Sequence, residues 1–208
     1  MSAAHRRRRG GRIIAAGSLL QLIAAALPDA RVFTSSDPRT QLEAIAARPR
    51  GWAAQAVGFP LAFSLTALGF ATVAAAMPDR RTRRLARMAA ALSAASTVLW
   101  VPIAVRRIEI GRRVDAMLAE QQPVVDIGAR TFWPYTVATL GSLICMGSAL
   151  ALSGLHRRLG AVVAVAGALA MLALPRLRDW PPFLSYVGTL ALGVGVARGP
   201  EQRRMHSA

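Results

Sequence analysis

Apolar residues fall into six long stretches along the chain, separated by segments rich in arginine, proline and acidic residues. A helix needs about 20 predominantly apolar residues to cross the hydrocarbon core of a bilayer, and most of these stretches approach that length. The pattern predicts an all-α membrane protein, a six-transmembrane-helix bundle that forms a single polytopic domain over residues 1–208. The expected spans are residues 13–28, 52–77, 87–106, 132–155, 159–175 and 182–197.

Small residues recur at intervals of four in the last three expected spans. Such rows let two helix backbones approach closely inside a membrane, where apolar side chains gain little by leaving the lipid. We therefore expect these rows to form helix–helix contacts. The rows are Gly147 and Ala151; Gly160, Ala164 and Ala168; and Thr189, Gly193 and Ala197.

Two long connections on the same side of the bundle, residues 29–51 and 107–131, each contain a short amphipathic helical pattern. In the first connection, Asp37 suits a helix cap and Pro38 suits the first helical position. We expect the two apolar faces to pack on each other as a cap over the helix ends. Alternatively, a lipid surface or a partner protein covers these two apolar faces. The residues concerned are Leu42 and Ile45 in the first connection and Ile110, Val114, Met117 and Leu118 in the second.

Arginine is distributed unequally between the two sides of the expected bundle. Both terminal tails, the 78–87 connection and the 156–158 turn carry fifteen arginines and two acidic residues, against eleven arginines and eight acidic residues in the other connections. Basic residues in short loops favour the cytoplasmic side, so both termini are expected in the cytoplasm. The residues expected to anchor this orientation are Arg80, Arg81, Arg83, Arg84 and Arg87.

The tryptophans indicate the same orientation. Trp52, Trp100, Trp133 and Trp180 all fall at span ends opposite to the arginine-rich connections. The indole ring is apolar with one polar edge, so it favours the interface between lipid and water. These residues are therefore expected to form an aromatic belt on the extracytoplasmic side.

The net charge of +16 accompanies 54% hydrophobic residues, and the two kinds of residue are segregated into blocks. This segregation favours a lipid bilayer over nucleic acid as the partner. All 26 basic residues are arginine, which together with abundant alanine is typical of high-GC bacterial genomes. We therefore expect a multi-pass protein of the bacterial cytoplasmic (inner) membrane. The basic N-terminus before a short apolar stretch also fits a signal peptide, and we favour an uncleaved first helix.

No ionisable residue falls well inside an expected span. Intramembrane charges usually mark proton relays and ion paths, so the pattern argues against a pump or an ion-coupled transporter. The three histidines, among them His156 in a basic turn, are expected near the cytoplasmic surface, and Cys145 is the single cysteine. We therefore expect no metal, no cofactor and no catalytic residue.

Aromatic and basic residues gather at the extracytoplasmic ends of the spans. A mouth of this composition is able to hold an anionic lipid or an amphipathic ligand. Alternatively, the rings anchor the interface and the arginines extend to the lipid headgroups. The candidate mouth residues are Trp100, Arg106, Arg107, Trp133, Arg178, Asp179, Trp180 and Tyr186.

Three functions remain open after this survey. We favour a non-catalytic accessory or scaffold subunit, whose partners are the bilayer and other membrane proteins or further copies of the chain. The alternative is a small facilitator or a lipid-binding protein that uses the mouth. A membrane enzyme comes third, and it would need outer-loop carboxylates such as Glu109, Asp115 and Asp126 as catalysts.

The orientation is testable by labelling a Ser36→Cys variant, in a Cys145→Ser background, with a membrane-impermeant thiol reagent. We expect Ser36→Cys to be labelled in whole cells, because residues 29–51 lie outside. Neutralising Arg80, Arg81, Arg83 and Arg84 together removes the densest charge and should give mixed labelling or poor insertion. A Thr82→Cys variant should be labelled only after lysis, and its labelling in intact cells would invert the orientation.

Overall fold

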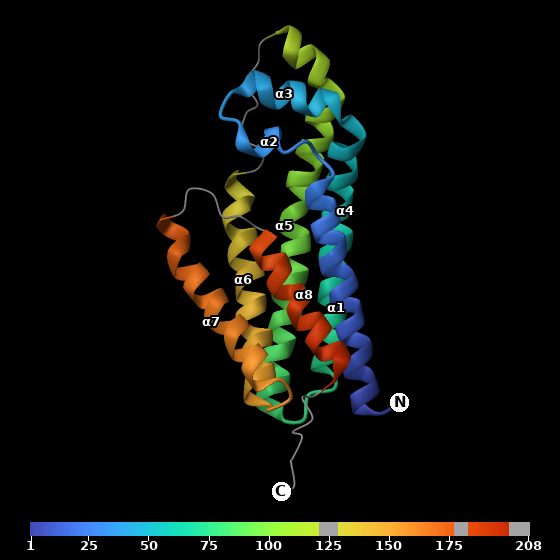
Figure 1. Cartoon of the computed structure of the whole chain (residues 1–208), viewed down its shortest axis with the longest axis vertical. Helices are drawn as coiled ribbons and strands as arrows, with labels where there is room; N and C mark the ends of the chain where they lie inside the picture. The colour runs from blue at the N-terminus through green and yellow to red at the C-terminus, as the bar shows by residue number, and fades with distance from the viewer. Residues whose placement is uncertain (121–128, 177–182, 200–208) are drawn as a thin grey trace, which may run out of the picture.

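The computed structural model describes residues 1–120, 129–176 and 183–199, and every regular element in these ranges is helical. Six long helices form an elongated bundle, and two short helices lie across one end of it (Figure 1). The long helices are α1 (Ala3–Ala26), α4 (Pro49–Ala74), α5 (Arg80–Ala119), α6 (Ala129–Leu152), α7 (Arg157–Ala173) and α8 (Phe183–Arg198). The short elements are α2 (Arg31–Thr34), α3 (Pro38–Ala47) and the 3₁₀ turn η1 (Leu174–Arg176).

The long helices pack in the spatial order α8, α1, α4, α5, α6, α7, with extensive contact between neighbours in this series. The N-terminus, the α4–α5 turn, the α6–α7 turn and the end of α8 all lie at one end of the bundle (Figure 1). Helix α7 leans away from the others toward its C-terminal end (Figure 1). It exposes a row of large apolar side chains, at Val162, Val165, Leu169 and Leu172.

Four helices in the described part of the chain are long and apolar enough to cross a membrane. These candidate spans are Pro49–Ala74, Arg80–Ala119, Thr131–Leu152 and Arg157–Arg176. Helix α8 is apolar but has only 16 residues. Helix α1 has 24 residues, and its first third is rich in arginine.

Helix α1 begins ten residues before the expected span. Its cap is Ser2, whose hydroxyl oxygen accepts a hydrogen bond from the backbone N–H of His5 at 3.2 Å. The arginine-rich tail is therefore helical. Its residues Gly10 and Gly11 are buried against α4 and α8.

The expected cap is confirmed. Helix α5 continues without interruption beyond the expected span, and α3 packs on this extension at the end opposite the N-terminus (Figure 1). Asp37 caps α3, and its carboxylate accepts the backbone N–H of Thr40 at 2.9 Å. The two apolar faces form one buried cluster, which includes Val32, Leu42, Ala44, Ile45, Trp52, Ile110, Val114 and Met117.

Glycine brings helix backbones into direct contact between several pairs of helices, including α6 with α7 and α8 with α1. A Cβ atom on Gly147 of α6 would lie 2.7 Å from the carbonyl oxygen of Gly160 in α7. A Cβ atom on Gly193 of α8 would lie 2.5 Å from the backbone nitrogen of Ala15 in α1. Both glycines belong to the rows of small residues expected to form contacts, which the structure confirms at these positions.

We expect Gly193→Ala to lower the free energy of unfolding by about 1–3 kcal/mol, because the added methyl group forces α1 and α8 apart. Gly188→Ala in the same helix is the matched control, since its Cβ would meet its nearest neighbour at an ordinary 3.7 Å. Thermal unfolding of the purified variants in detergent measures both effects. Equal stability of the two variants would show that the close approach is not needed.

Candidate functional site

Arg107 is an arginine with a buried side chain in the described part of the chain. Its side chain is 8% exposed, although it was expected at the start of an outer loop. Helix α5 continues through this position, in line with the helical pattern of the 107–131 connection, and the Arg107 side chain is buried in the bundle instead of extending to lipid headgroups. A buried charge is costly unless its surroundings replace the lost water, so the neighbours of Arg107 are informative.

Three aromatic rings surround the guanidinium group. Its central carbon lies 4.9 Å from the ring of Trp52, 5.1 Å from Trp100 and 5.5 Å from Phe33. Each ring presents a negative face to the cation, and such a contact is worth up to about 2 kcal/mol when water is excluded. We call Arg107 and these three rings the arginine cage.

Only some of the polar groups in the cage have hydrogen-bond partners among the described residues. One terminal guanidinium N–H donates to Oε1 of Gln55, and the Trp52 indole N–H donates to the backbone carbonyl of Arg107 at 2.7 Å. The Nε atom of Arg107 and the indole nitrogen of Trp100 are buried and have no hydrogen-bond acceptor among the described residues. Among the described residues, no carboxylate lies within ion-pair distance of Arg107. The cage therefore contains a positive charge and two buried N–H donors without acceptors among the described residues.

An aromatic cluster extends from the cage into the bundle and joins four helices. Trp100 packs against Tyr135 with ring centroids 5.0 Å apart, and the hydroxyl groups of Tyr135 and Tyr186 lie 3.0 Å apart. The rigid rings fix α4, α5, α6 and α8 around the inner side of the cage. The cluster contains Phe59, Phe63, Trp100, Tyr135 and Tyr186.

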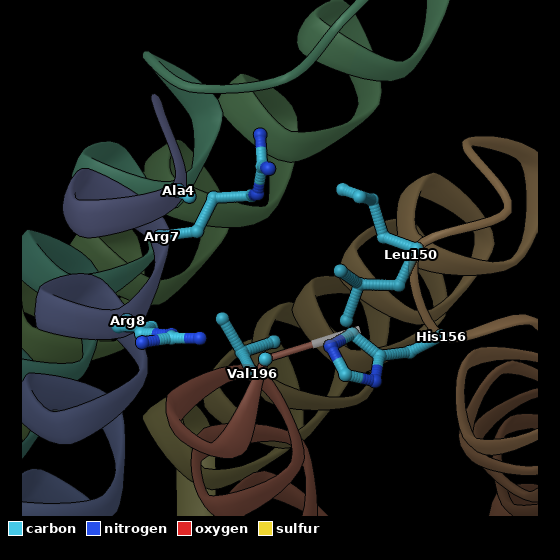
Figure 2. A pocket seen from close by; sticks show the side chains of 8 residues that line it. Ala4, Arg7, Arg8, Leu150, His156 and Val196 are labelled. Atoms are coloured by element: carbon cyan, nitrogen blue, oxygen red, sulfur yellow. The ribbon is translucent and has the colours of Figure 1, made fainter. Parts of the chain in front are cut away.

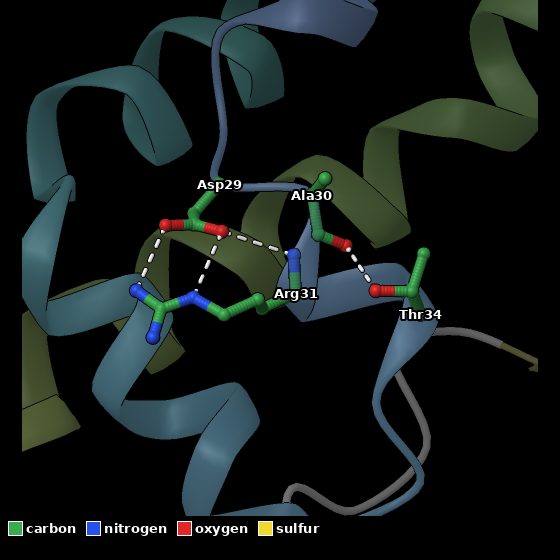
Figure 3. A network of polar contacts seen from close by, with 4 residues as sticks. All are labelled: Asp29, Ala30, Arg31 and Thr34. Carbon is green, nitrogen blue, oxygen red and sulfur yellow. Dashed lines mark hydrogen bonds and ion pairs between the residues drawn. The ribbon is translucent and has the colours of Figure 1, made fainter.

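The short helix α2 places Phe33 over the guanidinium group. The Asp29 carboxylate accepts hydrogen bonds from the backbone N–H of Arg31 at 3.0 Å and from its side chain at 3.2 and 3.0 Å (Figure 3). The Thr34 hydroxyl donates to the carbonyl oxygen of Ala30 at 3.1 Å (Figure 3). Phe33 is half exposed, so its ring contacts the guanidinium group while part of it faces the exterior.

The bonds from Arg31 lower the pKa of the Asp29 carboxyl from 3.8 to about 2. A lowered pKa in the folded state means that the ionised carboxylate favours folding. This contribution is complete above the ordinary pKa and is lost as the pH falls toward 2. At neutral pH the ionised Asp29 therefore keeps its contact with Arg31 in the turn that carries Phe33.

The predicted mouth is brought together only in part. Trp100, Arg107 and Tyr186 converge on the cage and the adjoining cluster. Arg106 instead forms an exposed ion pair with Glu109 at 2.9 Å, and Trp133 is 45% exposed. The remaining three residues, Arg178, Asp179 and Trp180, lie outside the described residues.

Phe33, Trp52 and Gln55 were not among the candidate mouth residues. Trp52 and Trp100 were expected in an aromatic belt at the lipid–water interface, but both are buried. Gln55 follows Trp52 by three residues, so the two side chains fall on one face of α4 and share the environment of Arg107. No comparable signal was available for Phe33, because its four-residue helix has no periodic pattern.

A second hollow lies at the opposite end of the bundle, between α1, the α6–α7 turn and α8. Arg8 and His156 face it from different elements (Figure 2). Its volume of about 10 Å³ is at most that of one water molecule, so we exclude it as a ligand site. His156 was expected near the surface but is buried, because the turn folds back under α6.

The carboxylates named for an enzyme are dispersed. Glu109 lies between Arg106 and Arg113, and Asp115 is exposed further along α5. Asp126 lies outside the described residues. Within the described ranges, no three His, Cys, Asp or Glu side chains come together in a way that could hold a metal ion.

Comparison of the chain with protein-family models, with curated proteins and with solved structures finds no match. The geometry of the cage is therefore the basis for the functional argument.

The structure predicts strong coupling between Arg107 and Gln55. Arg107→Met should lower the free energy of unfolding by about 1–3 kcal/mol, because it leaves the buried Gln55 carbonyl without a donor. Adding Gln55→Leu should restore most of this loss, since buried polar partners are often replaceable by apolar residues of similar size. A double-mutant cycle of thermal unfolding measures the coupling. Additive losses would contradict the assignment.

Proposed function

We propose that the chain is a six-span protein of the bacterial cytoplasmic membrane with both termini in the cytoplasm. The proposal adds α1 and α8 to the four candidate spans, and it is supported by their close contact through Gly193. The concentration of arginine at the end that carries the N-terminus supports the orientation (Figure 1).

The length of α5 then indicates the depth of the cage. Twenty residues separate Arg87 from Arg107, which corresponds to about 30 Å of helix, the thickness of the hydrocarbon core. With Arg87 at the cytoplasmic boundary, Arg107 lies at the outer boundary. The cage is therefore at the level of the headgroups in the outer leaflet.

Within this arrangement, the protein binds an anionic amphiphile whose carboxylate or phosphate group is held by Arg107. The buried guanidinium group without a carboxylate partner among the described residues is the observation that carries the proposal. An anionic oxygen would supply the acceptor that Arg107 Nε lacks, and the rings of the cage would exclude water around the pair. The half-exposed Phe33 marks the side of entry.

An accessory or scaffold role is the second candidate. Helix α7 favours it, because its side chains Val162, Val165, Leu169 and Leu172 are exposed and can contact lipid or another membrane protein. A further copy of the chain would also fit. This role requires no ligand at the cage.

Binding is testable by tryptophan fluorescence of the purified protein, because Trp52 and Trp100 flank Arg107. Dodecyl phosphate should produce a saturable change in fluorescence, whereas dodecanol, with the same chain and no charge, should not. The Gln55→Leu/Arg107→Met variant should remain folded and lose the response.

Arg106→Gln is the matched control, since it removes one positive charge from the adjacent, solvent-facing position. It should retain binding. Equal loss in both variants would indicate general electrostatic attraction, and an unchanged response in the double variant would place the ligand elsewhere. Either outcome, together with stable co-purification of a partner protein, would favour the scaffold role.

A further inference from the structure

Three arginines at the start of α5 line one side of an open surface hollow at the arginine-rich end of the bundle. The hollow has a volume of about 430 Å³ and is lined by Arg80, Arg81, Arg84 and Leu85. All three arginines are exposed. Within the described ranges, their side chains make no hydrogen bond or ion pair. We call this feature the arginine hollow.

The neighbouring charged residues Asp79 and Arg83 form no ion pair with the arginines of the hollow among the described residues. The Asp79 carboxylate caps α5 by accepting the N–H groups of Arg81 and Thr82 at 2.9 Å and the Thr82 hydroxyl at 2.6 Å. These bonds, led by the Thr82 hydroxyl, hold the pKa of Asp79 below its usual range, so it stays ionised as a cap. Arg83 turns away and donates to the carbonyl oxygen of Met77 at 2.9 Å.

The arginine hollow continues into an apolar surface in the direction of the bundle. Leu85 packs partly against the buried core at the same end. Met88 follows Arg84 by one helical turn and is exposed, so the face that carries guanidinium groups becomes apolar within one turn. A ligand that fits this face has a compact anionic head joined to an apolar chain.

We infer that the arginine hollow binds the phosphate group of an anionic lipid in the cytoplasmic leaflet. A guanidinium group can donate two parallel hydrogen bonds to the oxygens of one phosphate group. Three arginines beside the same hollow therefore offer several such paired hydrogen bonds. The acyl chain would run beside Met88 along α5. This site is separate from the arginine cage and does not depend on the function proposed for it.

The test is lipid retention by the full-length protein in mild detergent, measured by native mass spectrometry with phosphatidylglycerol and phosphatidylcholine offered together. Wild-type protein should retain phosphatidylglycerol preferentially. Replacing Arg80, Arg81 and Arg84 with Gln should weaken retention roughly fivefold for each arginine removed. Replacing the same three with Lys preserves charge and insertion but removes paired contacts, so it should give an intermediate loss.

The matched control replaces Arg9, Arg12 and Arg158 with Gln, which removes three exposed charges from the same end without touching the hollow. This variant should retain phosphatidylglycerol as the wild type does. Equal loss in the control would overturn the inference in favour of diffuse attraction. Displacement of the lipid by inorganic phosphate, or full retention in the Lys variant, would also overturn it.

Discussion

Direct contact between helix backbones is the constraint on which the bundle depends. Apolar side chains gain little when they move from lipid into a protein, so helices in a membrane are held together by close packing and by polar contacts between them. Gly193 provides such an approach between α8 and α1, and Gly147 provides one between α6 and α7. A single methyl group at either position would separate two helices, which is why small residues cannot be exchanged freely there.

Much of the architecture could be predicted from residue spacing. The contacts at Gly147 and Gly193 follow from the spacing of small residues along one helix face. The cap likewise follows from the apolar faces of two helices. Both patterns are local in sequence, so they could be recognised before the fold was known. The burial of Arg107 could not be predicted in this way. An arginine just after an apolar stretch usually extends toward lipid headgroups, and its burial depends on Phe33 and Gln55, which come from distant parts of the chain.

The two ends of the molecule treat positive charge in opposite ways. At one end, Arg107 is stripped of water and surrounded by rings, so it is sensitive to a single missing acceptor. At the other end, Arg80, Arg81 and Arg84 remain exposed to water, so salt weakens their attraction for an anionic group. Arg83 lies among these exposed arginines, but its side chain donates a hydrogen bond to the carbonyl oxygen of Met77, just beyond the end of α4. Neighbouring arginines in one connection therefore have different structural roles.

Helix α5 connects these two environments as one uninterrupted rod of 40 residues. Because each residue adds about 100° of rotation, inserting one residue near its middle would turn everything beyond it by more than a quarter of a circle. Arg107 would then leave its rings, and Ile110 would leave the cap. The length of α5 is therefore variable only in steps of about seven residues, or two full turns. Adaptation to a thicker or thinner bilayer would have to come from tilting the whole rod.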